Sequence, residues 1–155
     1  MKNKIYKSGV LLHPTALPGD WGIGELGDHA YKFIDDLVEM GQSYWQILPL
    51  GPLDNSHSPY SSLSTFAGNP LIISFDSLIK IKLLKANEIP DFANLNKSRI
   101  SFDETIVKRM RVFEIVCSNF NERADERLKK EFTIFCKENI DWLEDYSKFC
   151  ALKKA

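Results

Sequence analysis

Two short apolar segments decide the fold of this chain: Gly9-Val10-Leu11-Leu12-His13-Pro14 and Tyr44-Trp45-Gln46-Ile47-Leu48-Pro49. Each is a run of apolar and aromatic residues that ends at a proline, which is typical of a buried strand in a parallel sheet. About 34 residues separate Val10 from Tyr44, close to the size of one strand–helix–strand unit. The two segments therefore predict a parallel pair of strands joined by a right-handed crossover.

The residues between these segments predict the connecting helix. Four apolar side chains share one helical face between Asp28 and Met40, and they are Ala30, Phe33, Ile34 and Leu37. Gly41 follows at the position where a left-handed residue commonly ends a helix. A later apolar run, Leu71–Phe75, is expected to form an additional strand or a buried extended segment.

Glycine and proline are distributed unevenly along the 155 residues. All eight glycines lie at or before Gly68, and six of the seven prolines lie at or before Pro70. Because both residues mark turns, the first part should consist of short elements and tight loops, and the remainder of long helices. We expect residues 1–84 to hold the first strand and helix units, and residues 85–155 to form a helical subdomain.

The second half carries apolar side chains at helical spacing. They are Ile106, Met110, Phe113, Cys117, Phe120, Leu128, Phe132, Phe135, Trp142, Leu143, Tyr146, Phe149 and Cys150. This spacing predicts two or three amphipathic helices whose apolar stripe packs in the core. Cys117, Cys136 and Cys150 are widely spaced beside apolar residues, which predicts buried free thiols rather than a disulfide or a metal site.

The balance of charge excludes several classes of function. Lys and Arg number 20 against 21 Asp and Glu, so the net charge is −1 at pH 7. This predicts no binding of nucleic acid or of an anionic membrane surface. No apolar run reaches the roughly 18 residues of a membrane-spanning helix. The amino-terminal residues lack the apolar segment of a secretion signal, which predicts a cytoplasmic protein.

One glycine-rich segment matches the sequence pattern of a dinucleotide-binding turn. Residues 22–27 match G-x-G-x-x-G and precede the expected helix. A dinucleotide-binding turn must follow its strand directly, so that the pyrophosphate meets the helix N-terminus. Here residues 15–21 intervene after Pro14. We therefore expect these glycines to permit close packing of a loop, and we expect no cofactor.

The loop after the second segment is the predicted functional surface, because ligands of parallel α/β proteins bind at the carboxyl ends of the strands. It runs over residues 49–69 and contains Ser58-Pro59-Tyr60-Ser61-Ser62-Leu63-Ser64-Thr65-Phe66. Hydroxyl groups and a tyrosine suit a polyhydroxylated ligand, since the ring can stack on a sugar face. The alternative is a plain surface loop in which Tyr60 acts as a hydrophobic plug.

Five motifs follow one another in the first part of the chain: Ser8–Pro18, Gly22–Gly27, Tyr44–Pro52, Ser58–Tyr60 and Phe66–Pro70. In this order they resemble the amino-terminal part of the 4-alpha-glucanotransferases, also called amylomaltases or disproportionating enzymes. The resemblance implies an α/β fold, the start of a modified TIM (β/α)8 barrel with a helical insertion subdomain over residues 85–155. It also implies retaining transfer of α-1,4-glucan segments between maltooligosaccharides, in starch, glycogen or maltose metabolism.

By this resemblance, Ser58 and Tyr60 contact the sugar near the scissile bond, whereas His13 and Trp45 have structural roles at the strand ends. No metal and no other cofactor is implied. The chain departs from the family pattern at Ala16, where serine is common. It departs again over Leu53–His57, where a loop rich in glycine and tyrosine is more usual. The second departure leaves the acceptor preference open. The sequence also leaves the oligomeric state open.

The length of the chain sets a further expectation. A TIM barrel needs roughly 200 residues or more, and retaining transfer needs two carboxyl groups about 5 Å apart. In the family these carboxylates lie on later strands, and Asp20, Glu25 and Asp54 lack the paired spacing to replace them. We therefore expect an amino-terminal fragment that holds no catalytic residue and is inactive alone. The alternative is a non-catalytic module that binds α-glucan, or a partner protein, through the loop that contains Tyr60.

Overall fold

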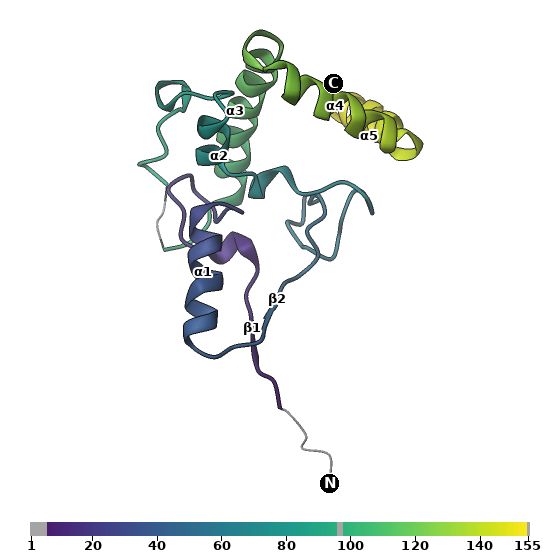
Figure 1. Ribbon diagram of the computed structural model, residues 1–155. Coiled ribbons are helices and arrows are strands. Elements are labelled where there is room, and N and C mark those ends of the chain that lie inside the picture. The colour runs from purple at the N-terminus through teal and green to yellow at the C-terminus, as the bar shows by residue number, and fades with distance from the viewer. Residues whose placement is uncertain (1–5, 96–97, 155) are drawn as a thin grey trace.

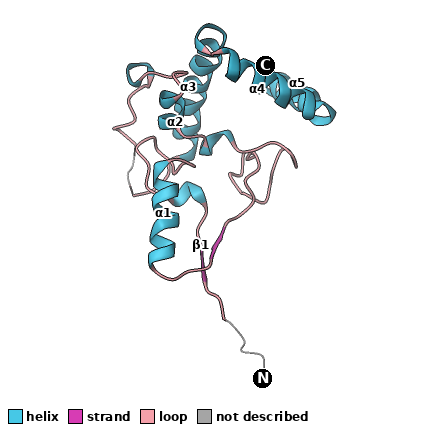
Figure 2. Cartoon of the chain, in the orientation of Figure 1, coloured by secondary structure: helices cyan, strands magenta, loops and turns pink. Residues whose placement is uncertain are grey.

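The computed structural model describes residues 6–95 and 98–154 of the chain (Figure 1). Its elements are β1 (Gly9–Leu11), α1 (Asp28–Glu39), β2 (Tyr44–Gln46), α2 (Phe75–Lys80), α3 (Phe102–Arg123), α4 (Glu126–Glu138) and α5 (Ile140–Lys154). Short 3-10 turns cover Pro14–Ala16, Pro70–Ile72 and Ala86–Glu88. Loops connect short elements in the first half and long helices fill the second half (Figure 2), as the distribution of glycine and proline predicts.

The predicted parallel pair of strands is confirmed. Strand β1 pairs with β2 in parallel, with Gly9 opposite Tyr44 and Leu11 opposite Gln46. Each strand is shorter than its apolar run, since β1 ends at Leu11 and β2 at Gln46. Helix α1 connects them and ends before Gly41, whose φ of 69° is the left-handed conformation expected there.

The expectation of a strand over Leu71–Phe75 is wrong. Residues Pro70–Ile72 form a 3-10 turn, and α2 begins at Phe75. Two side-chain caps decide this outcome, because Asn69 accepts a hydrogen bond from the Leu71 amide and Ser74 accepts one from the Ser77 amide. These caps satisfy backbone donors that a strand would present to a neighbouring strand.

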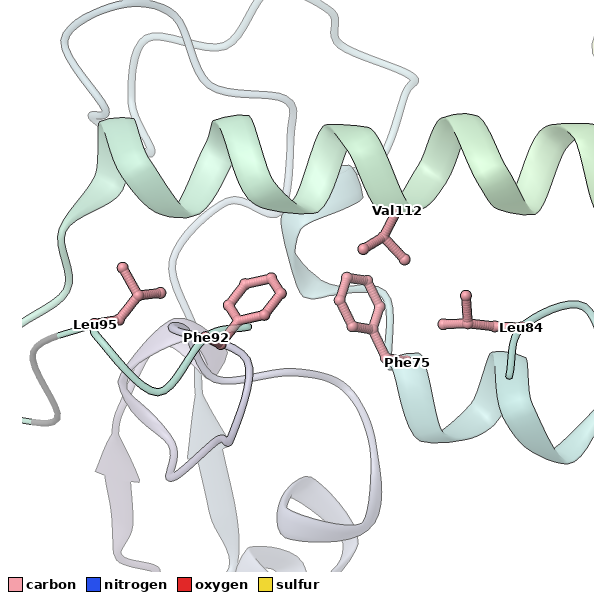
Figure 3. Packing of buried hydrophobic residues seen from close by; sticks show 5 residues of the cluster. All are labelled: Phe75, Leu84, Phe92, Leu95 and Val112. Carbon is pink, nitrogen blue, oxygen red and sulfur yellow. The ribbon is translucent and has the colours of Figure 1, made fainter. Parts of the chain in front are cut away.

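A buried aromatic and aliphatic cluster joins α2, the segment around residue 92 and α3. It consists of Phe75, Leu84, Phe92, Leu95 and Val112 (Figure 3). The Phe75 side chain is fully buried, and its ring centroid lies 5.9 Å from that of Trp21 and 5.6 Å from that of Phe113. Burial of one such phenylalanine contributes about 1.5–3 kcal/mol. The cluster takes residues from both sides of position 84, and the division into residues 1–84 and 85–155 stays a prediction.

A buried ion pair lies beside this cluster. Arg109 of α3 has no exposed surface, and its Nη1 lies 2.6 Å from Oε1 of Glu25, which is also buried. Arg109 Nη2 donates to the carbonyl oxygen of Ile73 at 2.5 Å. The second carboxylate oxygen of Glu25 accepts from the Phe75 amide at 3.2 Å. The guanidinium also lies 4.0 Å from the centroid of the Phe75 ring. One arginine therefore joins α3 to two segments from the first half.

The two charges of this pair compensate one another in a buried site. Burial raises the pKa of Glu25, and the charge and hydrogen bond of Arg109 oppose that rise. Burial likewise lowers the pKa of Arg109, against the effect of Glu25. Removal of either partner would leave an isolated buried charge, which is far more costly than the intact pair.

The buried face of α3 differs from the predicted stripe by one residue. The predicted positions are 106, 110, 113, 117 and 120, whereas the buried residues are Thr105, Arg109, Val112 and Asn119. The polar members of this face have specific partners: Arg109 pairs with Glu25, and Asn119 Nδ2 donates to the Leu83 carbonyl at 2.9 Å. Hydrophobic spacing alone missed this face, because three of its four buried residues are polar.

The prediction of buried thiols is wrong in part. All three cysteines are free, but Cys117 and Cys150 are exposed and Cys136 is half-buried. The shift of the buried face turns Cys117 toward solvent, because neighbouring helical positions differ by about 100°.

Helices α4 and α5 form a hairpin that extends away from α3 (Figure 1). The prediction that their apolar stripe packs in the core is wrong, because α4 contains no buried residue and no described side chain of α5 is buried. Phe132, Phe135 and Phe149 are each about half exposed. The Phe132 ring contacts Phe120 of α3, with 5.2 Å between the centroids. Two helices side by side can cover only one face of each other, so the remaining apolar side chains stay open to solvent.

A second ion pair holds the segment before α3 against the end of that helix. Arg123 donates to both carboxylate oxygens of Glu88, at 2.6 Å and 3.1 Å. The Lys85 amide donates to the same carboxylate at 2.9 Å. The hydrogen bond from Arg123 is the main cause that lowers the pKa of Glu88 from 4.5 to about 2.

The first prediction concerns the buried ion pair. Replacement Arg109→Ala leaves the Glu25 carboxylate buried without its partner, and we expect the free energy of unfolding to fall by about 3–5 kcal/mol. The measurement is urea unfolding followed by tryptophan fluorescence and circular dichroism. Arg111→Ala is the matched control, because Arg111 lies on the exposed side of the same helix. Equal effects of the two replacements would contradict the structural role of the pair.

The second prediction concerns pH. The pKa of Glu88 is lower in the folded chain than its ordinary value, so the carboxylate stabilises the fold above about pH 4.5. This contribution decreases as the pH falls from about 4.5 toward 2, the folded-state value. We expect Glu88→Gln to be less stable than the parent at pH 6 and equally stable near pH 2. Glu138→Gln, at an exposed position of α4, should show no such convergence.

Candidate functional site

The candidate site is the loop after the carboxyl end of β2, residues 47–69, which we call the Tyr60 loop. Its two halves are held together by backbone hydrogen bonds. Leu53 and Ser62 form an antiparallel bridge, and the Leu63 amide donates to the Pro52 carbonyl at 3.0 Å. The Asn69 amide donates to the Leu50 carbonyl at 2.7 Å, which closes the base of the loop. The loop is therefore closed at its base by backbone hydrogen bonds, and its tip lies near residues 54–61.

Short side-chain hydrogen bonds shape this tip. Asp54 Oδ1 accepts from the amide of Ser56 at 2.8 Å and from its hydroxyl at 2.5 Å. These bonds lower the pKa of Asp54, and the charge of Lys153 on α5 lowers it further. The tip therefore carries an ionised carboxylate that is already engaged with its own loop.

The two predicted substrate-binding residues lie together at the tip. The Ser58 hydroxyl accepts a hydrogen bond from the Tyr60 amide at 3.3 Å. Ser58 is half-buried, whereas Tyr60 is 75% exposed. A ring with three quarters of its surface open to solvent does not plug the loop. Its face and its hydroxyl are accessible to a ligand, which is the arrangement that a sugar-stacking residue requires.

His57 is a residue of the site that sequence reasoning did not assign. It has a left-handed backbone with φ of 56°, and its ring stacks on Phe102 at the start of α3 with 5.1 Å between centroids. Its Nε2 lies 3.4 Å from Oδ1 of Asp103. The only sequence signal was the departure of Leu53–His57 from the family pattern, and nothing local indicated a partner 45 residues away.

His13 and Trp45 both make contacts within the fold; His13 lies two residues after β1, and Trp45 is the middle residue of β2. His13 Nδ1 lies 2.8 Å from the Thr15 hydroxyl and caps the 3-10 turn that follows β1. Trp45 Nε1 donates to the Leu12 carbonyl at 2.7 Å, and the Trp45 ring contacts Phe33 of α1. Both contacts fix the strand ends from which the Tyr60 loop departs.

Two carboxylates of the first half, Glu25 and Asp54, have structural partners. Glu25 is buried in the pair with Arg109, and Asp54 binds Ser56. Arg109 itself was missed by sequence reasoning, because a charged residue on a buried helix face contradicts the hydrophobic pattern used to find that face. In the part of the chain that the structure describes, no group of three His, Cys, Asp or Glu residues could hold a metal ion.

The glycine motif at residues 22–27 packs closely, as predicted. A Cβ on Gly24 would lie 2.2 Å from the Pro14 carbonyl oxygen, and one on Gly27 would lie 2.5 Å from the Ser74 hydroxyl. The Gly24 amide donates to the Thr15 carbonyl at 3.0 Å. The Leu26 amide donates to the Ile72 carbonyl at 2.8 Å. The amides of Gly24 and Leu26 are thus engaged within the fold.

An open cavity of about 1180 Å³ lies between residues 15–24 and residues 86–95 and 98–102. Phe102, on which His57 stacks, belongs to the lining of this cavity, but Ser58 and Tyr60 do not.

No helix among residues 6–95 and 98–154 is long and apolar enough to cross a membrane.

These observations define a class of protein: an α/β chain with a parallel strand pair whose following loop presents hydroxyl groups and an exposed tyrosine. A family model described as 4-alpha-glucanotransferase matches residues 12–155. The chain therefore belongs to the 4-alpha-glucanotransferase family.

Individual relatives agree with this assignment. The chain is 40% identical over 148 residues to the 4-alpha-glucanotransferase of Synechocystis, a match that covers 96% of this chain and 29% of the relative. It is 42% identical over 144 residues to that of Clostridium butyricum, covering 92% and 28%. It is 50% identical over 157 residues to a chloroplastic/amyloplastic 4-alpha-glucanotransferase of Arabidopsis thaliana, covering 94% and 25%.

A solved structure is also similar. The amylomaltase from Streptococcus agalactiae in complex with acarbose superposes with a TM-score of 0.87 at 37% identity. The superposition covers 96% of this chain and 30% of the amylomaltase. The chain thus spans about three tenths of the length of the relatives that it matches, and its fold is that of one region of the amylomaltase.

Proposed function

We propose that this chain supplies the Tyr60 loop to a retaining 4-alpha-glucanotransferase, which transfers α-1,4-glucan segments between maltooligosaccharides. The observation that carries the proposal is the exposed Tyr60 ring beside the half-buried Ser58 hydroxyl, on an ordered loop at the carboxyl end of β2. Membership of the family supports it, as does the acarbose complex of the similar amylomaltase.

The proposal includes the surrounding architecture. The parallel pair of β1 and β2 with its connecting helix is the repeating unit from which a TIM barrel is built. In such barrels the substrate binds on the face formed by the loops that follow the strands, and the Tyr60 loop is one of these. Residues 85–155 would then be the helical insertion. The reaction uses no cofactor, and we place it in the cytoplasm.

The chemistry assigns binding and positioning to this chain. Retaining transfer proceeds through a carboxylate nucleophile and a second carboxyl group that acts as acid and base. We assign neither to residues 1–155, because Glu25 and Asp54 already bind partners of their own and Asp20 has no second carboxylate at the required spacing. The Tyr60 ring would stack on a glucose unit, and the Ser58 hydroxyl would hold the tyrosine in place through its amide.

The third prediction tests the assignment of catalysis. Residues 1–155 alone, incubated with maltotriose, should release no glucose and form no longer oligosaccharides, since the two carboxyl groups of the reaction are lacking. The products are separated by chromatography after removal of host enzymes. Detectable disproportionation would place the catalytic carboxylates within this chain. Binding of maltoheptaose without turnover would favour the alternative, a non-catalytic module that binds α-glucan.

The fourth prediction tests Tyr60 in a complete enzyme. In a chimera, residues 1–155 replace the matching segment of the Clostridium butyricum 4-alpha-glucanotransferase. We expect Tyr60→Ala to lower kcat/KM for maltooligosaccharides by roughly 10- to 100-fold, because misplacement of a substrate by about 1 Å costs on the order of 100-fold in rate. The melting temperature should change little, since the exposed ring contributes little to the core.

Two controls make this result specific. Tyr60→Phe keeps the ring and removes the hydroxyl, so it should retain most of the activity if stacking is the main contact. Thr65→Ala changes another exposed residue of the same loop and should leave kcat/KM unchanged. A lowered melting temperature with unchanged kinetics for Tyr60→Ala would show that the tyrosine supports the fold instead of the sugar.

A further inference from the structure

The Tyr60 loop is in contact with the helical half of the chain at two separate places. Near its tip, His57 stacks on Phe102, the first residue of α3, with an interplanar angle of 14°. On its return to α2, Phe66 stacks on Trp142 of α5 with 5.9 Å between centroids and an angle of 21°. Ser58 and Tyr60 lie between these two contacts in the sequence, so the segment that presents them is held at both ends.

Each contact is supported from the helical side. Trp142 Nε1 donates to Asn139 Oδ1 at 3.0 Å, which orients the indole. The Tyr146 ring lies 6.3 Å from the Trp142 ring on the same helix. At the other contact, Asp103 lies 3.4 Å from His57 Nε2. Each aromatic partner of the loop thus has contacts of its own on the helical side.

The contacts within the loop do not replace these two. Hydrogen bonds of Ser62 and Ser64 turn the chain locally, and Asn69 closes its base. They set the shape of the loop, but they do not set its direction relative to the rest of the molecule. Phe66 is 70% exposed, so burial in the core does not hold it either. The direction of the loop depends on what its rings meet outside it.

We propose that the helical half positions the glucan-binding loop, with Trp142 and Phe102 as positioning residues that act through Phe66 and His57. The expected effect on catalysis rests on the proposed function. The positioning of the loop by the helices does not, because it can be measured on this chain without a substrate. Trp142 touches no substrate in this scheme. It increases the fraction of molecules in which Tyr60 is oriented for binding, and the apparent affinity scales with that fraction.

The size of the effect follows from the strength of one aromatic pair. Such a pair shifts an equilibrium by about 2- to 10-fold. Loss of the Phe66–Trp142 stack should therefore speed amide hydrogen exchange in residues 54–66 by roughly 2- to 10-fold. In a complete enzyme it should raise KM for maltotriose by a similar factor and leave kcat within about twofold, because bound substrate itself orders the loop.

The first experiment uses residues 1–155 as they are and needs no glucan. Hydrogen exchange of residues 54–66 is compared among Trp142→Ala, Phe66→Ala, the double replacement and Trp142→Phe. We expect both single replacements and the double replacement to show the same increase, since each removes one shared contact. Trp142→Phe should restore slow exchange because it keeps a ring. Phe149→Ala, on the same helix and stacked only on Tyr146 among the described rings, is the control.

The outcomes separate the two proposals. Unchanged exchange in Trp142→Ala, with helix content preserved by circular dichroism, would overturn the positioning role whatever the enzyme does. If Trp142→Ala lowers helix content, Phe66→Ala gives the same test from the loop side without touching α5. In the chimera, a raised KM for Trp142→Ala supports the proposal, and a fall in kcat alone contradicts it. Failure of Tyr60→Ala to change kcat/KM would overturn the proposed function and leave the exchange result standing.

Discussion

The structure depends on one interaction, the buried ion pair between Arg109 and Glu25. Without it, the amino-terminal part of α3 would meet the first half of the chain mainly through packing around Phe75, which has little directional preference. The guanidinium instead binds the Glu25 carboxylate and the Ile73 carbonyl at once, so one side chain fixes the angle and register of α3 against two loops. Buried charge is costly by itself, but here each charge of the pair compensates the other.

That arrangement has a consequence for the proposed site. Helix α3 begins at Phe102, only two turns before Arg109, and Phe102 is where His57 of the Tyr60 loop stacks. The far end of α3 leads into the hairpin of α4 and α5, which presents Trp142 to Phe66. The ion pair therefore lies on the same helix as Phe102, the nearer of the two contacts of the loop. An interaction that stabilises the fold and the loop proposed to bind glucan are thus linked through α3.

The features predicted from the sequence were those with local causes. Strands over residues 9–11 and 44–46 follow from short apolar runs that end near prolines, and the helix cap at Gly41 follows from the freedom of glycine. The close packing of Gly24 follows from the absence of a side chain. The errors had non-local or competing causes. Caps from Asn69 and Ser74 overrode the strand pattern of residues 71–75, and polar partners shifted the buried face of α3.

The sequence by itself determined the family, the parallel strand pair and the place of Ser58 and Tyr60 on the loop that follows it. These depend on residue type, order and spacing, which are properties of the linear chain. Only the tertiary structure decided that Arg109 is buried, that Tyr60 is exposed, and that the loop lies against Phe102 and Trp142. The contacts of Arg109, Phe102 and Trp142 join residues between about 40 and 85 positions apart in the sequence. Pairing at that distance is decided by packing and charge compensation in space, which no local pattern encodes.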